Sequence, residues 1–277
     1  MGPKMRDARV TPARPDLAAA HLKGAVDAPR FADGEKFAIT VGRASLRVRP
    51  NDNAAQDSEL LFGEIFIVYD RAHGWAWGQA ANDLYVGYVK DDVMAGPFAP
   101  QAKVTALMAP VFCAADLKTP VRDLLPMNAA VPVLAREGDY VKIGADQYLH
   151  QRHLTPLTGK DFAAVAERFL GVPYVWGGKT AAGLDCSGLI QTALQAVGKA
   201  APRDTDMMEK ALGDIVPLSE VRRGDLVFWK GHMGVMLDED RLLHANAFHM
   251  AVAIEPLAEA MARIEKVAGP VSAVKRL

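Results

Sequence analysis

Residues 184–190 read Leu-Asp-Cys-Ser-Gly-Leu-Ile and lead into a regular apolar pattern. Apolar side chains then recur at helical spacing, at Leu189, Ile190, Ala193, Leu194 and Val197. This spacing predicts a helix that Gly198 ends. Cys186 is therefore expected at the first turn of that helix, with Asp185 near the capping position.

A cysteine at a helix start is a candidate nucleophile. The free backbone N–H groups and the positive end of the helix dipole favour a thiolate there, and they can also stabilise an oxyanion. We therefore expect Cys186 to be a nucleophile, the alternative being a small buried side chain. Cys113 has none of these supporting features, and we expect it to have no catalytic role.

A thiol nucleophile needs a base, and histidine is the usual choice. Strand patterns within residues 225–245 predict a hairpin. If its turn is centred on Asp238, His232 and His244 lie directly opposite each other on one face, so that His244 orients His232. A turn of even length would offset the pair by one position. His249 is expected on the opposite face and not as a partner.

A zinc site built from Cys186, His232 and His244 is the competing interpretation. No two of these residues have the close spacing that is usual in zinc sites. We therefore expect no metal, and we expect no cofactor.

The chain before the cysteine reads as short strands and turns. Five β-rich runs within residues 36–95 predict a small barrel, and a weaker repeat of this pattern within 102–157 predicts a second one. The period becomes helical at Asp161, which is expected to cap a helix. Before the first barrel, residues 16–22 could form a short helical turn.

These patterns predict an α+β domain behind two small all-β barrels. The expected division is an N-terminal arm over 1–34, a first barrel over 35–98, a second barrel over 99–158 and the α+β domain over 159–277.

Composition excludes several classes of function. Of 277 residues, 32 are Lys or Arg and 33 are Asp or Glu, so the net charge of −1 gives no electrostatic basis for binding nucleic acid or a membrane. No apolar run approaches the roughly 18 residues of a membrane-spanning helix. The first 23 residues lack the apolar run of a secretory signal, and two cysteines make no disulfide framework. We therefore expect a cytoplasmic protein.

The motifs of the last hundred residues, in this order, resemble those of the NlpC/P60 family of papain-like cysteine peptidases, which act on bacterial cell-wall peptides. The matching stretches are Tyr174-x-Trp-Gly-Gly178, Asp185-Cys-Ser-Gly188, Pro202-Arg-Asp204, Arg223-Gly-Asp-Leu-Val-Phe-Trp229, His232-Met-Gly-Val235 and His244-Ala245. The resemblance implies that Cys186 is the nucleophile, His232 the base and His244 the third, orienting residue.

Two SH3-like barrels ahead of such a domain resemble the γ-D-glutamyl-L-diamino acid endopeptidases, also called dipeptidyl-peptidase VI. The resemblance implies hydrolysis of the γ-D-Glu–L-diamino acid bond in short murein peptides with a free N-terminal L-Ala, in peptidoglycan peptide recycling. It makes Glu64 the carboxylate that binds the amine, and Tyr88, or alternatively Tyr85, a pocket tyrosine. The other substrate-binding positions that it implies are Tyr174, Trp176, Asp185, Ser187 and Asp204.

Other functions on the same scaffold stay open. A thioester formed on Cys186 could serve an acyltransferase or an amidase, and the chain could be a non-catalytic peptidoglycan-binding module. Diaminopimelate and lysine are both compatible with the third position of the peptide. We expect a murein peptide as the partner and a monomer.

Overall fold

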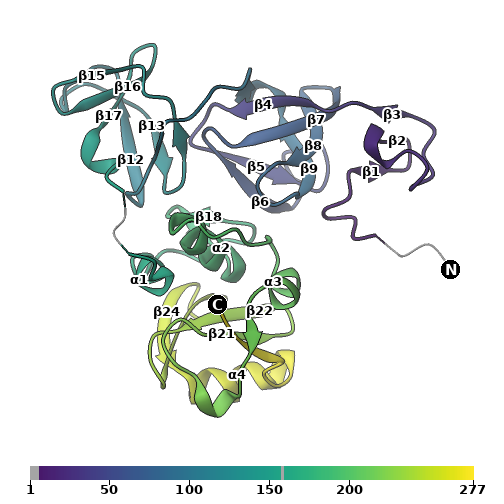
Figure 1. Cartoon of the computed structure of the whole chain (residues 1–277), viewed down its shortest axis with the longest axis vertical. Helices are drawn as coiled ribbons and strands as arrows, with labels where there is room; N and C mark the ends of the chain where they lie inside the picture. Colours follow the sequence, from purple (N-terminus) through teal and green to yellow (C-terminus); the bar gives the residue numbers. More distant parts are fainter. Residues whose placement is uncertain (1–5, 157–158) are drawn as a thin grey trace. The chain divides into compact units, whose positions relative to one another are not determined.

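Strands make up the first half of the chain, and every α-helix that the structure describes lies after residue 160 (Figure 1). The computed structural model describes residues 6–156 and 159–277. They belong to two units, an N-terminal unit of residues 1–104 with 108–154 and a C-terminal unit of residues 105–107 with 155–277. The domain limits expected at residues 34, 98 and 158 stay predictions.

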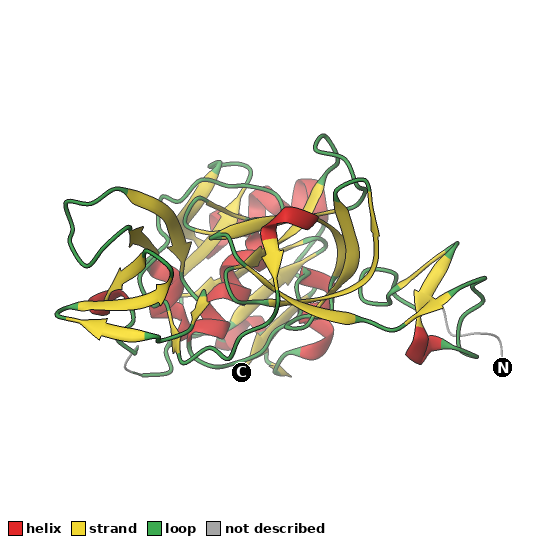
Figure 2. Cartoon of the chain, turned by 90° about the horizontal axis from the view of Figure 1, so that it is seen from above, coloured by secondary structure: helices red, strands yellow, loops and turns green. Residues whose placement is uncertain are grey.

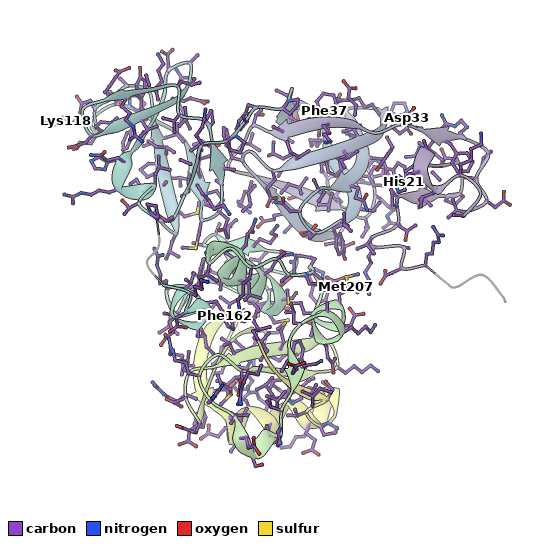
Figure 3. The ribbon with its side chains drawn as sticks, in the orientation of Figure 1. His21, Asp33, Phe37, Lys118, Phe162 and Met207 are labelled. Carbon is purple, nitrogen blue, oxygen red and sulfur yellow. The ribbon has the colours of Figure 1, made fainter. Side chains whose placement is uncertain are left out.

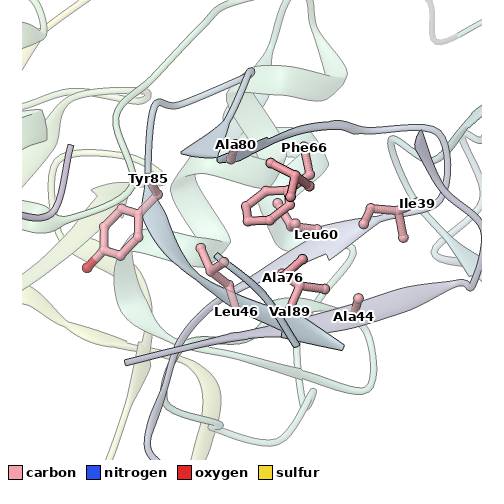
Figure 4. Packing of buried hydrophobic residues seen from close by; sticks show 10 residues of the cluster. Ile39, Ala44, Leu46, Leu60, Phe66, Ala76, Ala80, Tyr85 and Val89 are labelled. Atoms are coloured by element: carbon pink, nitrogen blue, oxygen red, sulfur yellow. The ribbon is translucent and has the colours of Figure 1, made fainter. Parts of the chain in front are cut away.

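The first barrel is a seven-stranded sheet with the order β10-β4-β7-β8-β9-β5-β6. Its strands are β4 (Glu35–Ile39), β5 (Arg43–Arg47), β6 (Gln56–Leu61), β7 (Ile65–Ala72), β8 (Trp75–Ala80), β9 (Val86–Lys90) and β10 (Met94–Ala95), with the 3-10 turn η2 (Asp91–Val93) before β10. Its core is a cluster of buried apolar side chains around Leu46, Phe66 and Val89 (Figure 4). The five strand-like runs are confirmed. The sequence pattern missed β6, because this strand begins with the polar run Gln-Asp-Ser-Glu.

The second barrel has a five-stranded sheet with the order β13-β12-β17-β16-β15, and a two-stranded ladder β11-β14. Its elements are β11 (Ala102–Lys103), β12 (Met108–Phe112), β13 (Val121–Pro126), β14 (Ala130–Val131), β15 (Ala135–Glu137), β16 (Tyr140–Gly144), β17 (Gln147–His150) and η3 (Gln151–His153). The barrels touch along their backbones, where the Ala130 N–H donates to the Phe62 carbonyl over 2.9 Å. A Cβ at Gly63 would lie 2.0 Å from the Ala130 oxygen, so this approach requires glycine.

Residues 6–34 of the N-terminal arm do not form a helical turn over residues 16–22. They form a small three-stranded sheet next to the N-terminus (Figure 2), made of β1 (Ala13–Arg14), β2 (Leu17–Ala19) and β3 (Phe31–Ala32), with only η1 (Ala20–Leu22) helical. All three residues of β2 are buried, which a short exposed helical turn could not achieve. The Val86 N–H donates to the Arg9 carbonyl over 2.7 Å and ties the arm to the first barrel.

The C-terminal unit is built on a six-stranded antiparallel sheet with the order β20-β25-β21-β22-β23-β24. The strands are β20 (Asp214–Ile215), β21 (Leu226–Trp229), β22 (His232–Met236), β23 (Arg241–Asn246), β24 (Ala251–Pro256) and β25 (Ala273–Arg276). The other elements are α1 (Phe162–Glu167), β18 (Lys179–Thr180), β19 (Gly183–Leu184), α2 (Cys186–Ala196), α3 (Thr205–Ala211), η4 (Leu218–Glu220) and α4 (Leu257–Ala268). Figure 3 labels Phe162 at the start of α1 and Met207 on α3.

Helices cover both faces of this sheet. Figure 1 shows α2 and α4 on opposite sides of β21 and β22. Leu257, Ala260 and Ile264 of α4 form one apolar cluster with Met236 and Leu242 of the sheet. The position of α2 at the sheet brings its first residue close to the start of β22, where the candidate site lies.

Within the residues that the structure describes, no helix combines the length and the apolar character needed to cross a membrane.

Candidate active site

Cys186 is the first residue of α2, as the sequence predicts. Asp185 occupies the N-cap position, and its Oδ1 accepts the Gly188 N–H over 2.6 Å. A Cβ at Gly188 would lie 2.1 Å from the carbonyl oxygen of Gly178, so glycine lets the preceding loop pack directly on the helix start. The helix therefore begins at a fixed point, and the cysteine is held there by backbone contacts.

Asp185 also forms a buried ion pair that sequence analysis did not identify. Both guanidinium nitrogens of Arg203 donate to its carboxylate, over 2.6 and 3.0 Å, and Arg203 is only 1% exposed. Asp185 Oδ2 further accepts the Gly177 N–H over 2.8 Å. These bonds hold the loop before Cys186 and the start of α2 in place, and the expected substrate-binding role of Asp185 stays a prediction. The signal for Arg203 was present in the motif Pro202-Arg-Asp204, which gave it no role.

The Cys186 sulfur is buried beside α3 and the start of β22. The hydroxyl of Thr205 lies 3.7 Å from Sγ, and the Met233 N–H hydrogen-bonds to it. Burial raises the pKa of the thiol to about 11, and Asp185 acts in the same direction, whereas Thr205, Met233 and Arg203 lower it. The helix terminus alone was expected to favour the thiolate. Since burial places the pKa of this thiol above its ordinary value, the thiol needs a nearby proton acceptor to ionise.

The hairpin confirms two strands but not the predicted register. Val235 pairs with Leu243 and Met236 pairs with Leu242, so the turn is centred on Glu239 and not on Asp238. His232 and His244 are therefore not directly opposite, but diagonal, with a shift of two residues. A shift of two keeps both side chains on one face of the sheet.

The two imidazoles meet across this diagonal. His232 Nε2 lies 2.8 Å from His244 Nδ1. A Cβ at Gly234 would lie 3.0 Å from His244 Cβ and 2.9 Å from the Leu243 carbonyl oxygen, so glycine makes room for the contact. Met233, whose N–H contacts the sulfur, is the residue after His232. The sulfur of the candidate nucleophile thus lies against the backbone of the residue that follows the candidate base.

The contact continues to two residues that sequence analysis missed. His244 is fully buried, and its Nε2 lies 2.6 Å from Glu255 Oε1 on β24. Arg263 of α4 donates through Nη1 to Glu255 Oε2 over 2.6 Å and through Nη2 to Oε1. A carboxylate that interrupts the apolar run Ala251-Val-Ala-Ile254 was the available signal for Glu255.

Burial lowers the pKa of both histidines. The pKa of His232 falls to about 3, with His244 and Arg263 acting in the same direction and Glu255 against it. The pKa of His244 falls to about 4, because burial outweighs the hydrogen bond to Glu255. Both rings are therefore neutral at pH 7, as a general base and its orienting partner must be.

The substrate-binding residues expected in this unit differ in burial and in hydrogen-bond partners. Tyr174 is half-buried, and burial together with the nearby Cys186 and Asp185 raises the pKa of its hydroxyl. Trp176 is 68% exposed and available for contact. Ser187 is buried and hydrogen-bonds to Asp185 and Arg203. Asp204 lies at the start of α3, but its carboxylate does not cap the helix.

The residues expected from the first barrel have partners within the N-terminal unit. Glu64 is buried, and its carboxylate accepts the Leu61 N–H over 3.0 Å and the Asn82 side-chain N–H over 2.8 Å. Tyr88 lines a cavity of about 390 Å³ beside the arm. Tyr85 belongs to the barrel core, with its hydroxyl directed away from the cluster (Figure 4).

One group of described residues has the composition of a metal site. Potential ligand atoms of His244, His249 and Glu255 lie within 4.8 Å of one another. His249 was expected on the opposite face, but β23 ends at Asn246, so strand alternation does not extend to it. The Arg263 guanidinium on Glu255 opposes a cation at this point.

Comparisons with known proteins agree with this geometry. Residues 171–268 match the NlpC/P60 family, and residues 46–92 match the bacterial dipeptidyl-peptidase SH3 domain. The gamma-D-glutamyl-L-lysine dipeptidyl-peptidase of Bacillus subtilis (strain 168) is 31% identical over 151 residues, which are 49% of this chain and 51% of the relative. The dipeptidyl-peptidase 6 of Lysinibacillus sphaericus is 24% identical over 234 residues, 73% of this chain and 84% of the relative.

A solved structure of an NlpC/P60 family protein from Bacillus cereus ATCC 10987 has the same fold. Its TM-score is 0.72 at 18% identity, covering 87% of this chain and 99% of the other. The chain spans about half the length of the Bacillus subtilis relative, and about a quarter of mycobacterial relatives named probable endopeptidases. The expected α+β fold with SH3-like sheets is confirmed.

Proposed function

Because residues 171–268 form a domain of the NlpC/P60 family, a family of cysteine peptidases, we propose that this chain hydrolyses short bacterial cell-wall peptides. The bond attacked is the amide between γ-D-Glu and the L-diamino acid. The observation that carries this proposal is the arrangement at the start of β22. The Cys186 sulfur accepts the Met233 N–H there, and the neighbouring His232 contacts His244 over 2.8 Å.

The chemistry follows from the protonation states of these groups. Before the attack, the Cys186 thiol and the His232 ring are both neutral. The thiol therefore transfers its proton to His232 as the sulfur attacks the γ-carbonyl of D-Glu. Backbone N–H groups at the start of α2 stabilise the tetrahedral oxyanion. His232 then donates the proton to the leaving amine, and it later activates the water that hydrolyses the thioester.

The finer part of the proposal concerns substrate choice. A free ammonium on L-Ala needs a buried anion or acceptor, and the Glu64 carboxylate of the N-terminal unit and the Asp204 carboxylate of the C-terminal unit each have that chemistry. A peptide with a blocked N-terminus offers these carboxylates no ammonium, so we expect it to bind more weakly. The substrates are then free peptide fragments, as in cytoplasmic recycling of peptidoglycan peptides. The names of the relatives from Bacillus subtilis and Lysinibacillus sphaericus support removal of a dipeptide.

The first experiment compares wild-type enzyme with Cys186→Ala on L-Ala-γ-D-Glu-diaminopimelate. We expect C186A to lose all measurable turnover, because no nucleophile remains, while its melting temperature stays close to wild type. Cys113→Ala is the matched control and keeps wild-type turnover. Wild-type turnover in C186A would refute the assignment.

Two further measurements separate the alternatives. Mass spectrometry in ¹⁸O-labelled water detects labelled product for hydrolysis, but unlabelled product for transfer to another acceptor. Binding of wall material without turnover of any peptide would favour the non-catalytic module. Turnover of the N-acetylated peptide tests the amine site, and equal rates with both peptides would refute the roles of Glu64 and Asp204. KM values of the variants E64Q, Y85F and Y88F then show which of these residues of the first barrel bind the substrate, because loss of a binding residue raises KM.

A further inference from the structure

Four side chains form a continuous chain behind the candidate nucleophile. His232 on β22 contacts His244 on β23, His244 contacts Glu255 on β24, and Arg263 on α4 holds Glu255 with two hydrogen bonds. The Arg263 guanidinium lies over the Phe248 ring, 4.2 Å from its centroid. The proposed catalytic roles use only the first two members, so Glu255 and Arg263 have no assigned role.

The protonation of Glu255 determines the direction of every hydrogen bond among these four side chains. Arg263 and His244 lower the pKa of the Glu255 carboxyl, so Glu255 is a carboxylate at neutral pH. A carboxylate only accepts hydrogen bonds. His244 Nε2, 2.6 Å away, must therefore carry a proton.

The tautomer of one histidine then decides that of the other. A neutral imidazole protonated at Nε2 has a bare Nδ1, which accepts a hydrogen bond. His232 Nε2 lies 2.8 Å from that atom and must be the donor. Neutral His232 consequently carries its proton on Nε2, and its Nδ1 lone pair is free to take the proton of a thiol.

We propose that Glu255 is a positioning residue that acts through His244 to keep Nδ1 of His232 unprotonated. This inference rests on the proposed function for its catalytic meaning, but not for the tautomers themselves. When the thiol proton moves to His232 Nδ1, the ring becomes an imidazolium that donates from both nitrogens. No other proton moves, because His244 stays neutral and still accepts from His232. The Glu255 charge stabilises the imidazolium through the intervening ring.

Arg263 keeps the carboxylate in this orientation. Its two N–H groups hold both oxygens of Glu255, so the carboxylate plane cannot rotate away from His244. The stack on Phe248 fixes the guanidinium in turn. The row of side chains from His232 to Glu255 is therefore held in place by Arg263 of α4, a helix that is far from Cys186 in the sequence.

Glu255→Gln tests the proposal by reversing one hydrogen bond. Arg263 Nη1 keeps its hydrogen bond to the amide oxygen, and the amide NH₂ group takes the place of Oε1, where it displaces Arg263 Nη2 and makes His244 Nε2 an acceptor. The proton of His244 then moves to Nδ1, and that of His232 also moves to Nδ1, where it blocks the base. We expect kcat to fall about 100-fold with KM within threefold. Glu265→Gln makes the same chemical change on exposed α4 surface, and it leaves kcat unchanged.

Nitrogen-15 NMR of the histidine rings reads the tautomers without any turnover. Wild-type protein is expected to show a bare Nδ1 in both His232 and His244, and E255Q to show a protonated Nδ1 in both. A protonated Nδ1 of His232 in the wild type overturns the proposal. If the wild type shows the expected tautomers but cleaves no peptide, the proposed function fails and this inference stands.

A double-mutant cycle distinguishes an effect of Glu255 that passes through His244 from an effect on general stability. In His244→Asn, the amide oxygen accepts from His232 Nε2 whatever residue stands at position 255. We expect E255Q to lower kcat less than threefold in that background, against about 100-fold in the wild type. Equal losses in both backgrounds would mean that Glu255 acts through stability alone.

Discussion

Two carboxylate–arginine pairs support the two halves of the candidate site in different ways. Asp185 and Arg203 stand behind the cysteine, and the Asp185 carboxylate holds backbone N–H groups of the loop and of α2. Glu255 and Arg263 stand behind the histidines, and the Glu255 carboxylate holds a ring. The Arg203 side chain is fully buried, whereas that of Arg263 is 26% exposed.

We expect the first pair to stabilise the fold and the second pair to control the protonation of the histidines. Breaking the first pair leaves a buried charge and frees the loop before Cys186, so it should damage the fold. The second pair is partly exposed to water, which can compensate for a lost partner. Its loss should change the tautomer and the orientation of the histidines more than the stability of the unit.

The largest effect is expected for Arg203→Met. It leaves the Asp185 carboxylate buried without its partner, which costs about 3 to 5 kcal/mol in the free energy of unfolding. Chemical denaturation measures this loss, and activity disappears with it. Arg223→Met is the control, because Arg223 is part-exposed in its pairs with Asp161 and Glu167 and should cost less than about 1 kcal/mol. Similar losses in both variants would contradict the distinction.

A smaller effect is expected for Arg263→Gln. The free energy of unfolding should fall by about 1 kcal/mol, because the Arg263 side chain is 26% exposed and water replaces part of its hydrogen bonding. The value of kcat should fall about 10-fold at constant KM, since Glu255 keeps its hydrogen bond to His244 but loses its fixed orientation. Steady-state kinetics and denaturation of the same preparation measure both. A loss of stability as large as that of R203M would place both pairs in the same structural role.

The smallest effect is a dependence of stability on pH. The pKa values of His232 and His244 are about 3 and 4 in the folded protein, against 6.5 in an unfolded chain. Between pH 6.5 and 4 the unfolded chain binds more protons, so stability falls as the pH falls through this window. Melting temperatures at pH 7.5 and 5 measure the decline, and H244N should decline less. An equal decline in H244N would show that His244 does not contribute.

The local chemistry of the cysteine loop could be predicted from sequence. The Asp185 cap and the helix spacing depend on contacts within a few residues, and the structure confirms the start of α2 at Cys186. The hairpin register could not be predicted so well. Asp238 accepts the N–H groups of Asp240 and Arg241, and this turn moves the centre of the hairpin to Glu239. The histidines still lie on one face of the sheet, because the predicted pairing was wrong by two residues and side chains alternate with a period of two.

Other elements depended on contacts distant in the chain. The arm forms strands because β2 buries Leu17, Ala18 and Ala19, and isolated propensity could not show this. Sequence analysis also gave no role to Arg203 and Glu255. The partner of Arg203 is 18 residues away, and those of Glu255 are 11 and 8 residues away on other elements, so only the fold brings them together. Charged residues in a sequence normally indicate a solvated surface.

The sequence by itself determined the candidate reactive groups, the helix that starts at the cysteine and the shared face of the two histidines, because capping and strand alternation are local properties. Only the tertiary structure decided which charges support these groups. Packing on the sheet buries Arg203 and Glu255, and a buried charge must find a partner wherever the fold provides one.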